Sequence, residues 1–265
     1  MDLPKKFLAR IVKKLDSPNI RGIALGGSYA RGEAGIFSDV DILPLMRDDA
    51  EVPGKRFLLD KGKLVSVSPK TGASIRQQMS RPEKAIWVVP GVRSCKVLLD
   101  KDGGLGEVIE EARTFRWEKL QNSADRYAAE DLVLGVEVAF KVLSALQRDE
   151  AAVSYAGAKL LSWLTNIMAV QRGVLIETDH TYYEQVQRVV GVDSVWTSYH
   201  KIAAGISAGD NEIETPSLPL PVRALATLHL YRETVLLIEH ILSAEQLDIA
   251  MQVVRYTVTS NPRTV

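Results

Sequence analysis

The stretch from Gly26 to Ile42, which reads GGSYARGEAGIFSDVDI, contains the residues whose types and spacing could support chemistry. A short apolar strand pattern leads into a Gly-Gly-Ser turn, and a helical pattern begins just after the turn. Glycines let the backbone approach a ligand closely, and exposed N–H groups at the start of a helix favour anions. The turn at Gly27 and Ser28 is therefore a candidate binding site for a phosphate group.

Two carboxylates follow this turn in the pattern Asp39-Val40-Asp41. Alternate residues of a strand point to the same face, so the two carboxylates project together while Val40 and Ile42 point to the other face. Two adjacent carboxylates repel each other unless a cation lies between them, and hard oxygen ligands near an anionic substrate favour Mg²⁺. A phosphate-binding turn next to such a pair predicts phosphoryl chemistry.

Each of these features has an ordinary structural explanation when it stands alone. A Gly-Gly-Ser sequence is a common turn, and an Asp-x-Asp pair is often a solvated strand edge. Their combination favours a functional site, with Arg31 between them and Ser38 leading into the acidic pair. The stretch is not a dinucleotide fingerprint, because the G-x-G-x-x-G spacing is absent, and it lacks the G-K-[ST] ending of a P-loop.

A second candidate pair occurs in the later, helical part of the chain. From Leu132 to Leu146 the residues are almost wholly apolar, and the charged ones are Glu137 and Lys141. A helix that is apolar nearly all round is expected to be buried, and residues four apart share one face. The pair is therefore either a structural ion pair or a buried pair that faces a cleft.

Short strands and helices alternate in the first part of the chain and must position the acidic pair. We expect an amphipathic helix within residues 1–15, a helix at 73–80, and strands at 22–25, 39–46, 56–59, 63–68, 86–89 and 96–99. Asp60-Lys61-Gly62 marks a hairpin turn, and Pro90-Gly91 separates the last two strands.

Strand signals stop near Thr114, and helical patterns take over at 118–147, 151–171, 179–190 and 222–242. Three prolines predict a non-helical connection at Thr215–Pro221. We therefore predict an α/β (α+β) domain with a mixed sheet at 1–117, an all-α helical bundle at 118–256, and a loose tail at 257–265.

The composition is that of a globular protein and argues against several classes. Lys+Arg and Asp+Glu are balanced at 33 each, which argues against a general nucleic-acid binder. Cys95 is the only cysteine, so no intrachain disulfide or cysteine-rich zinc site can form. We expect a cytoplasmic protein without a membrane partner, because no secretory signal or membrane-spanning apolar run is visible. The four histidines form no metal-ligand pattern and are expected at the surface or in caps: His180, His200, His229 and His240.

The pattern of Gly27-Ser28 followed by Asp39-x-Asp41 between apolar residues resembles the signature of the DNA polymerase β-type nucleotidyltransferase superfamily. The chain is similar above all to the kanamycin (aminoglycoside 4′) nucleotidyltransferase-like proteins and to the minimal nucleotidyltransferases. The hairpin, the strand that ends at Asp100 and the change to a helical second half extend the likeness over most of the chain.

The resemblance implies a role for each candidate residue. The Gly27-Ser28 turn would hold the triphosphate, with Arg31 and Ser38 in the same nucleotide-binding stretch, and the acidic pair would bind Mg²⁺. Glu137 would be the general base that deprotonates the acceptor hydroxyl, and Lys141 would place a positive charge near the phosphates. The resemblance also implies a homodimer.

The chain departs from the family pattern at Ser66. The family carries a third carboxylate on the strand after the hairpin turn, aimed at the same metal site. Here Ser66 alternates with Val65 and Val67, so it is expected on the strand beside Asp39 and Asp41 and facing them. A hydroxyl supplies no charge. Either two acids hold the metal, another carboxylate fills in, or activity is reduced or lost.

These features lead to one main hypothesis and two alternatives. The main hypothesis is a Mg²⁺-dependent nucleotidyltransferase that moves a nucleoside monophosphate from an NTP such as ATP to a hydroxyl of a small-molecule acceptor, with an aminoglycoside-like antibiotic as one candidate. The first alternative is a catalytically weakened nucleotide-binding protein of the same fold. The second is a toxin that transfers a nucleotide to protein or tRNA, although the balanced charge counts against tRNA.

Overall fold

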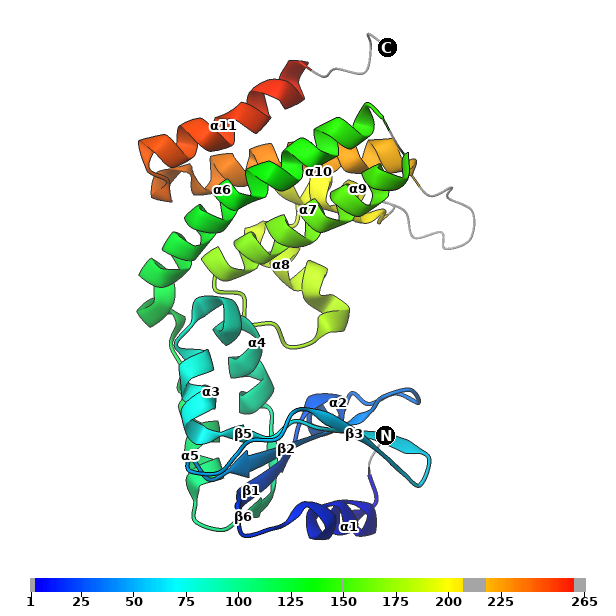
Figure 1. Ribbon diagram of the computed structural model, residues 1–265, viewed down its shortest axis with the longest axis vertical. Helices are drawn as coiled ribbons and strands as arrows, with labels where there is room; N and C mark the ends of the chain where they lie inside the picture. The colour runs from blue at the N-terminus through cyan, green and yellow to red at the C-terminus, as the bar shows by residue number, and fades with distance from the viewer. Residues whose placement is uncertain (1–2, 149, 207–217, 260–265) are drawn as a thin grey trace. The chain divides into compact units, whose positions relative to one another are not determined.

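The computed structural model describes residues 3–148, 150–206 and 218–259 (Figure 1). The chain divides into two compact units. Unit 1 comprises Met1–Leu120 with Leu175–Glu177, and unit 2 comprises Gln121–Val174 with Thr178–Val265. Unit 1 holds a mixed sheet and unit 2 is helical, as the sequence predicts.

The sheet of unit 1 has the strand order β3-β4-β2-β1-β6 in the described residues. β1 is antiparallel to β2 and β6, β2 is parallel to β4, and β3 and β4 form the expected hairpin. The short β5 pairs with the end of β2. The strands are β1 (Ile20–Leu25), β2 (Val40–Met46), β3 (Arg56–Asp60), β4 (Lys63–Val67), β5 (Lys70–Thr71) and β6 (Lys96–Asp100).

Helices cover both faces of this sheet (Figure 1). α1 (Lys5–Leu15) buries one apolar stripe in a core that includes Val40 and Val65, which confirms the amphipathic pattern. The other face packs against a second core, to which Ala24 and Leu45 contribute. The helices on that side are α3 (Gly72–Met79), α4 (Pro82–Arg93) and α5 (Gly104–Arg113).

The expected strand at 86–89 is wrong, because these residues belong to α4. Their β-branched side chains and the following Pro90 resemble a strand that ends at a turn, but the buried positions Ile86 and Val89 recur at helical spacing. Proline has no N–H for the carbonyl four residues earlier. That carbonyl, of Ile86, instead accepts a hydrogen bond of 2.7 Å from the backbone of Ile176. A distant segment therefore satisfies the bond that Pro90 cannot make.

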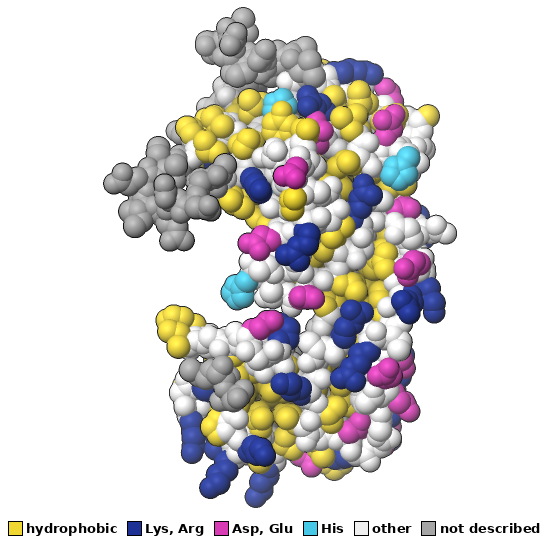
Figure 2. Space-filling model, turned by 180° about the vertical axis from the view of Figure 1, so that it is seen from behind, with side chains coloured by type: hydrophobic (Ala, Val, Ile, Leu, Met, Phe, Trp, Pro, Cys, Tyr) yellow, Lys and Arg dark blue, Asp and Glu magenta, His cyan; other side chains and the backbone are white. Residues whose placement is uncertain are grey.

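Unit 2 is built from α6 to α11 in the described residues (Figure 1). These helices are α6 (Gln121–Leu146), α7 (Glu150–Gln171), α8 (Tyr182–Val190), α9 (Val195–Ala204), α10 (Leu220–Ile238) and α11 (Ala244–Thr259). Tyr231 is fully buried, and its hydroxyl donates a 3.1 Å hydrogen bond to the carbonyl of Leu132. Basic and acidic side chains are interspersed over the face of unit 2 in Figure 2.

Besides α4, the sequence-based expectation also lacks the helices α5, α9 and α11. α11 continues through Thr257, which is buried, so the expected tail begins inside a helix, and residues 260–265 lie outside the described residues. The expected connection at Thr215–Pro221 overlaps α10, whose first turn holds Pro221 where the missing N–H has no intrahelical acceptor. Residues 215–217 of that connection lie outside the described residues. No described helix has the length and apolarity needed to cross a bilayer.

His200 corrects the expectation that the histidines lie at the surface or in caps. Its ring is fully buried in unit 2, between the side chains of Thr165 and Gln187. Gln187 Nε2 lies 2.9 Å from His200 Nδ1, so that ring nitrogen accepts and the imidazole is neutral. Burial lowers the pKa of His200 from 6.5 to about 4.

The buried His200 is expected to make stability depend on pH. Its folded-state pKa is depressed, so the stability it contributes is present above pH 6.5 and is lost as the pH falls toward 4. The loss between pH 7 and pH 4.5 should be about 2 to 3 kcal/mol in the free energy of unfolding. Denaturant titrations at both pH values should show this drop in the wild type but not in His200→Gln. Parallel pH profiles for the two proteins would contradict the assignment.

Candidate active site

The Gly-Gly-Ser turn packs directly against the second aspartate. β1 ends at Leu25, and the N–H of Gly26 donates a 2.9 Å hydrogen bond to the carbonyl of Asp41. α2 (Gly27–Arg31) starts at once, and Gly27 has a φ of +60°. A Cβ at Gly27 would overlap the carboxylate of Asp41. Only glycine fits this position, so the turn and the carboxylate form one structural feature.

Asp39 and Asp41 are an unpaired acidic pair at the start of β2. Asp39 directly precedes the strand, and both residues are half-buried. Among the described residues, no Lys, Arg or His nitrogen lies within 4.0 Å of either carboxylate. Burial raises the pKa of Asp41, and the charge of Asp39 raises it further, while Lys55 acts in the opposite direction. A bound cation would relieve this repulsion.

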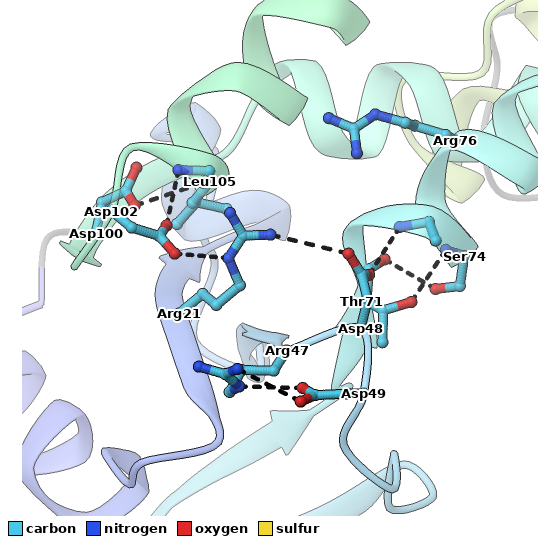
Figure 3. Close-up of polar contacts among 12 residues, drawn as sticks. Arg21, Arg47, Asp48, Asp49, Thr71, Ser74, Arg76, Asp100, Asp102 and Leu105 are labelled. Atoms are coloured by element: carbon cyan, nitrogen blue, oxygen red, sulfur yellow. Dashed lines mark hydrogen bonds and ion pairs between the residues drawn. The ribbon is translucent and has the colours of Figure 1, made fainter.

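The charged residues at the other end of the sheet are arranged differently (Figure 3). Asp102 receives a 2.7 Å hydrogen bond from Arg21, and Asp49 receives one of 3.0 Å from Arg47. The arginines lower the pKa of both carboxyl groups. Asp100 accepts hydrogen bonds from backbone N–H groups at the start of α5. These acids are paired within the fold, whereas Asp39 and Asp41 have no basic side chain within ion-pair distance among the described residues.

Ser66 lies directly beside Asp41, because β4 pairs with β2 in the register Asp41 opposite Ser66. It is 1% exposed, and its Oγ has no hydrogen-bond partner among the described residues. The hydroxyl is near enough to favour the charged form of Asp41, yet its contact falls outside hydrogen-bond geometry. An orphaned buried hydroxyl beside two unpaired carboxylates fits a hydrated metal ion or a metal-bound water.

The described residues bring no third acid to the pair formed by Asp39 and Asp41. In the part of the chain that the structure describes, no group of three His, Cys, Asp or Glu side chains could hold a metal. The residues present therefore fit Mg²⁺ through two carboxylates, with the remaining ligands supplied by water and by substrate phosphates. Ser66 can contribute only a neutral oxygen.

Arg31 and Ser38 occupy the segment between the turn and the acidic pair. Arg31 ends α2, and its Nε lies 2.7 Å from Glu33 Oε2. Its charge also lowers the pKa of Asp41. Ser38 Oγ accepts a 2.9 Å hydrogen bond from the N–H of Gly35 and so closes the loop that precedes β2. Ser38 thus has a structural bond of its own, while Arg31 adds positive potential at the acidic pair.

Lys55 is a contributor that the sequence did not indicate. It is exposed in the loop before β3, and its charge favours the ionised form of Asp41. Its Nζ also lies 5.1 Å from the ring centroid of Phe57. Because Lys55 is distant from the motif in sequence and follows no pattern, only the fold relates it to the acidic pair.

Glu137 and Lys141 form an exposed ion pair in unit 2, which agrees with the first of the two alternatives and not with a buried pair. Lys141 Nζ lies 2.6 Å from Glu137 Oε1, and the side chains are 58% and 76% exposed, respectively. The apolar composition of α6 does not imply burial of the whole helix, because α6 also exposes large apolar side chains, such as Leu134 at 61%. The hydrogen bond from Lys141 holds the pKa of Glu137 below its usual range. Their catalytic roles stay predictions.

Unit 1 combines a mixed sheet with a glycine turn that packs against an acidic residue at the start of the neighbouring strand. Residues 6–90 match the family model described as "Nucleotidyltransferase domain", and that range contains the turn, the acidic pair and Ser66. The chain thus combines a nucleotidyltransferase fold with an all-α region. The nearer likeness to the kanamycin type stays a prediction.

The solved structures include a nucleotidyltransferase-like protein from Exiguobacterium sibiricum 255-15 that is similar to this chain. The two share 15% sequence identity and superpose with a TM-score of 0.48. The similarity covers 97% of this chain and 80% of that one. No curated protein matches the sequence.

Proposed function

We propose that this protein is a Mg²⁺-dependent nucleotidyltransferase that moves a nucleoside monophosphate from an NTP to a hydroxyl group of a small-molecule acceptor. The proposal rests on one observation: the carboxylate of Asp41, next to that of Asp39, lies against the Gly27 turn within the segment that matches the nucleotidyltransferase family model. An anion-binding turn and a cation-binding pair in contact are suited to an NTP with its metal.

The residues of the chain would act mainly by positioning and by charge. Asp39 and Asp41 would hold Mg²⁺, which supplies charge neutralisation at the phosphates. Backbone N–H groups at Gly27 and Ser28 would bind the triphosphate, and Arg31 would add positive charge. The acceptor oxygen attacks the α-phosphorus, the bond to the β-phosphate oxygen breaks, and pyrophosphate leaves. Glu137 would take the proton from the acceptor hydroxyl.

The position of Ser66 favours a second candidate function, a nucleotide-binding protein with weak or no turnover. The metal site lacks one negative charge relative to the family pattern, and no described acid replaces it. Transfer to protein or tRNA is the third candidate. The interspersed charges on unit 2 give tRNA no continuous basic face in the view of Figure 2.

Release of pyrophosphate tests the proposed function. The full chain is incubated with Mg²⁺ and each of the four NTPs, against aminoglycosides and against neutral and anionic hydroxylated compounds. Acceptor-dependent release is expected for at least one pair of substrates, and the Asp41→Asn variant serves as the blank. NTP binding that depends on Asp41, without release for any acceptor, would instead support the binding protein. Sedimentation of the same sample tests the proposed homodimer.

Restoring an acid at Ser66 should increase metal affinity. Without metal, a third carboxylate in this buried site raises repulsion, so Ser66→Asp should lower the melting temperature. Adding Mg²⁺ without NTP should recover that loss in Ser66→Asp but leave Ser66→Asn, its neutral match in size, unchanged. A rise in transfer rate is also expected if the site is degenerate. Equal Mg²⁺ responses in the two variants would show that Ser66 does not face the metal site.

A further inference from the structure

A cavity of about 240 Å³ opens beside Asp41 within unit 1. Leu43 of β2 and the α4 side chains Trp87, Val88 and Val92 give it mostly apolar walls. Pockets for whole drug-sized ligands span roughly 300–1,000 Å³. This cavity is smaller, so its size suits one ring rather than an entire nucleotide.

Lys70 of β5 is the one cation that lines this cavity among the described residues. It is half-buried, and its Nζ donates a 2.8 Å hydrogen bond to Gln78 Oε1. No described carboxylate lies within 4.0 Å of it. An ammonium group has three donors, so two remain for a ligand. Burial lowers the pKa of Lys70.

We propose that this cavity is a binding subsite for a single ring that carries a carbonyl or carboxylate oxygen directed at Lys70. The inference rests on the proposed function, because the cavity shares Asp41 with the metal site and a ring held there would adjoin the reacting phosphate. Two parts of the substrates have this chemistry: the nucleobase of the NTP and the ring of an anionic or neutral acceptor. When Mg²⁺ offsets the charge of Asp41, which also lines the cavity, the charge of Lys70 disfavours a cationic ring such as that of an aminoglycoside.

Gly91 of α4 allows the cavity to be filled without disturbing the fold. It lines the cavity, and a Cβ at this position meets no atom within 4 Å. Gly91→Leu should therefore narrow the cavity, and leucine favours a helix more than glycine does. Lys70→Met removes the charge and keeps the stem. Lys84 is an exposed lysine of α4, so Lys84→Met is the matched control.

Calorimetric titrations of the full chain distinguish the two sources of the ring. The probes are the four NTPs with Mg²⁺, tripolyphosphate with Mg²⁺, 4-hydroxybenzoate, and tyramine as its cationic counterpart. If the nucleobase enters, Gly91→Leu and Lys70→Met weaken NTP binding at least about tenfold and leave tripolyphosphate binding unchanged. If the acceptor enters, the two variants weaken 4-hydroxybenzoate binding by a similar factor and spare the NTPs. Tyramine should not bind in either case.

One result would contradict the proposed subsite, and a different result would contradict the proposed function. If both variants bind every probe as tightly as Lys84→Met does, or if tyramine binds as well as 4-hydroxybenzoate, the cavity is not the proposed subsite. The proposed function then still stands, provided that NTP and tripolyphosphate bind with Mg²⁺ and lose affinity in Asp41→Asn. If neither phosphate probe binds the wild type, the proposed function fails, and 4-hydroxybenzoate alone decides the cavity.

Discussion

The Asp41→Asn variant is expected to lose nucleotidyl transfer while it keeps the fold of unit 1. Asparagine matches aspartate in shape, so the contact with Gly27 and the strand pairing opposite Ser66 can persist. The variant removes a negative ligand from a site with two acids. The transfer rate should fall by more than about 100-fold, since even residues that only support a metal ligand contribute about 10–100-fold.

Stability measurements separate this loss from misfolding. The pKa of Asp41 is raised, so its ionised form opposes folding as the pH rises above its ordinary titration range. Asp41→Asn should therefore melt at the same or a slightly higher temperature than the wild type at pH 7. NTP with Mg²⁺ should raise the melting temperature of the wild type but not of the variant. Asp49→Asn, at the other end of β2, should behave as the wild type. Near-normal transfer by Asp41→Asn would exclude the metal role.

The local geometry of the candidate site follows from sequence rules. Alternation along β2 places Asp39 and Asp41 on one face. Alternation along β4 turns Ser66 away from Val65 and Val67, which are buried in the core shared with α1. The Lys61-Gly62 turn has positive φ at both residues, which fixes the hairpin and its register. Short-range rules suffice here because each one concerns neighbours in one strand or one turn.

Contacts between distant segments account for what the sequence did not predict. Residues 86–89 of α4 resembled a strand that ends at Pro90. The helix tolerates Pro90 because the backbone N–H of Ile176 satisfies the carbonyl of Ile86, and no local pattern reveals that contact. Lys55 and Lys70 come near Asp41 only through the sheet and have no motif of their own. The sequence left the exposure of Glu137 open because apolar residues on the outer face of α6, such as Leu134, have the same composition as a buried face. Composition cannot tell an exposed apolar face from a core.

Glu137→Gln is expected to slow transfer by about 10²–10⁴-fold, the usual contribution of a general base. Lys141 lowers the pKa of Glu137, so the carboxylate is ionised and able to accept a proton throughout the neutral range. NTP binding should change little, because the expected role of Glu137 is to deprotonate the acceptor hydroxyl and not to bind the NTP. Steady-state rates with saturating NTP, together with NTP affinity, test this split. Glu130→Gln, another exposed acid of α6, is the matched control.

The exposure of Glu137 makes a shared site between two copies testable. An exposed carboxylate can deprotonate an acceptor only when that acceptor also reaches Asp39 and Asp41, on the same chain or on a second one. If a dimer shares its sites, mixing Asp41→Asn with Glu137→Gln should restore part of the activity, because one combined site then has both intact groups. If each chain works alone, the mixture should be no faster than its content of Glu137→Gln allows. A rate for Glu137→Gln equal to that of Glu130→Gln would remove Glu137 from the mechanism, and the Glu137–Lys141 contact would then be a surface ion pair.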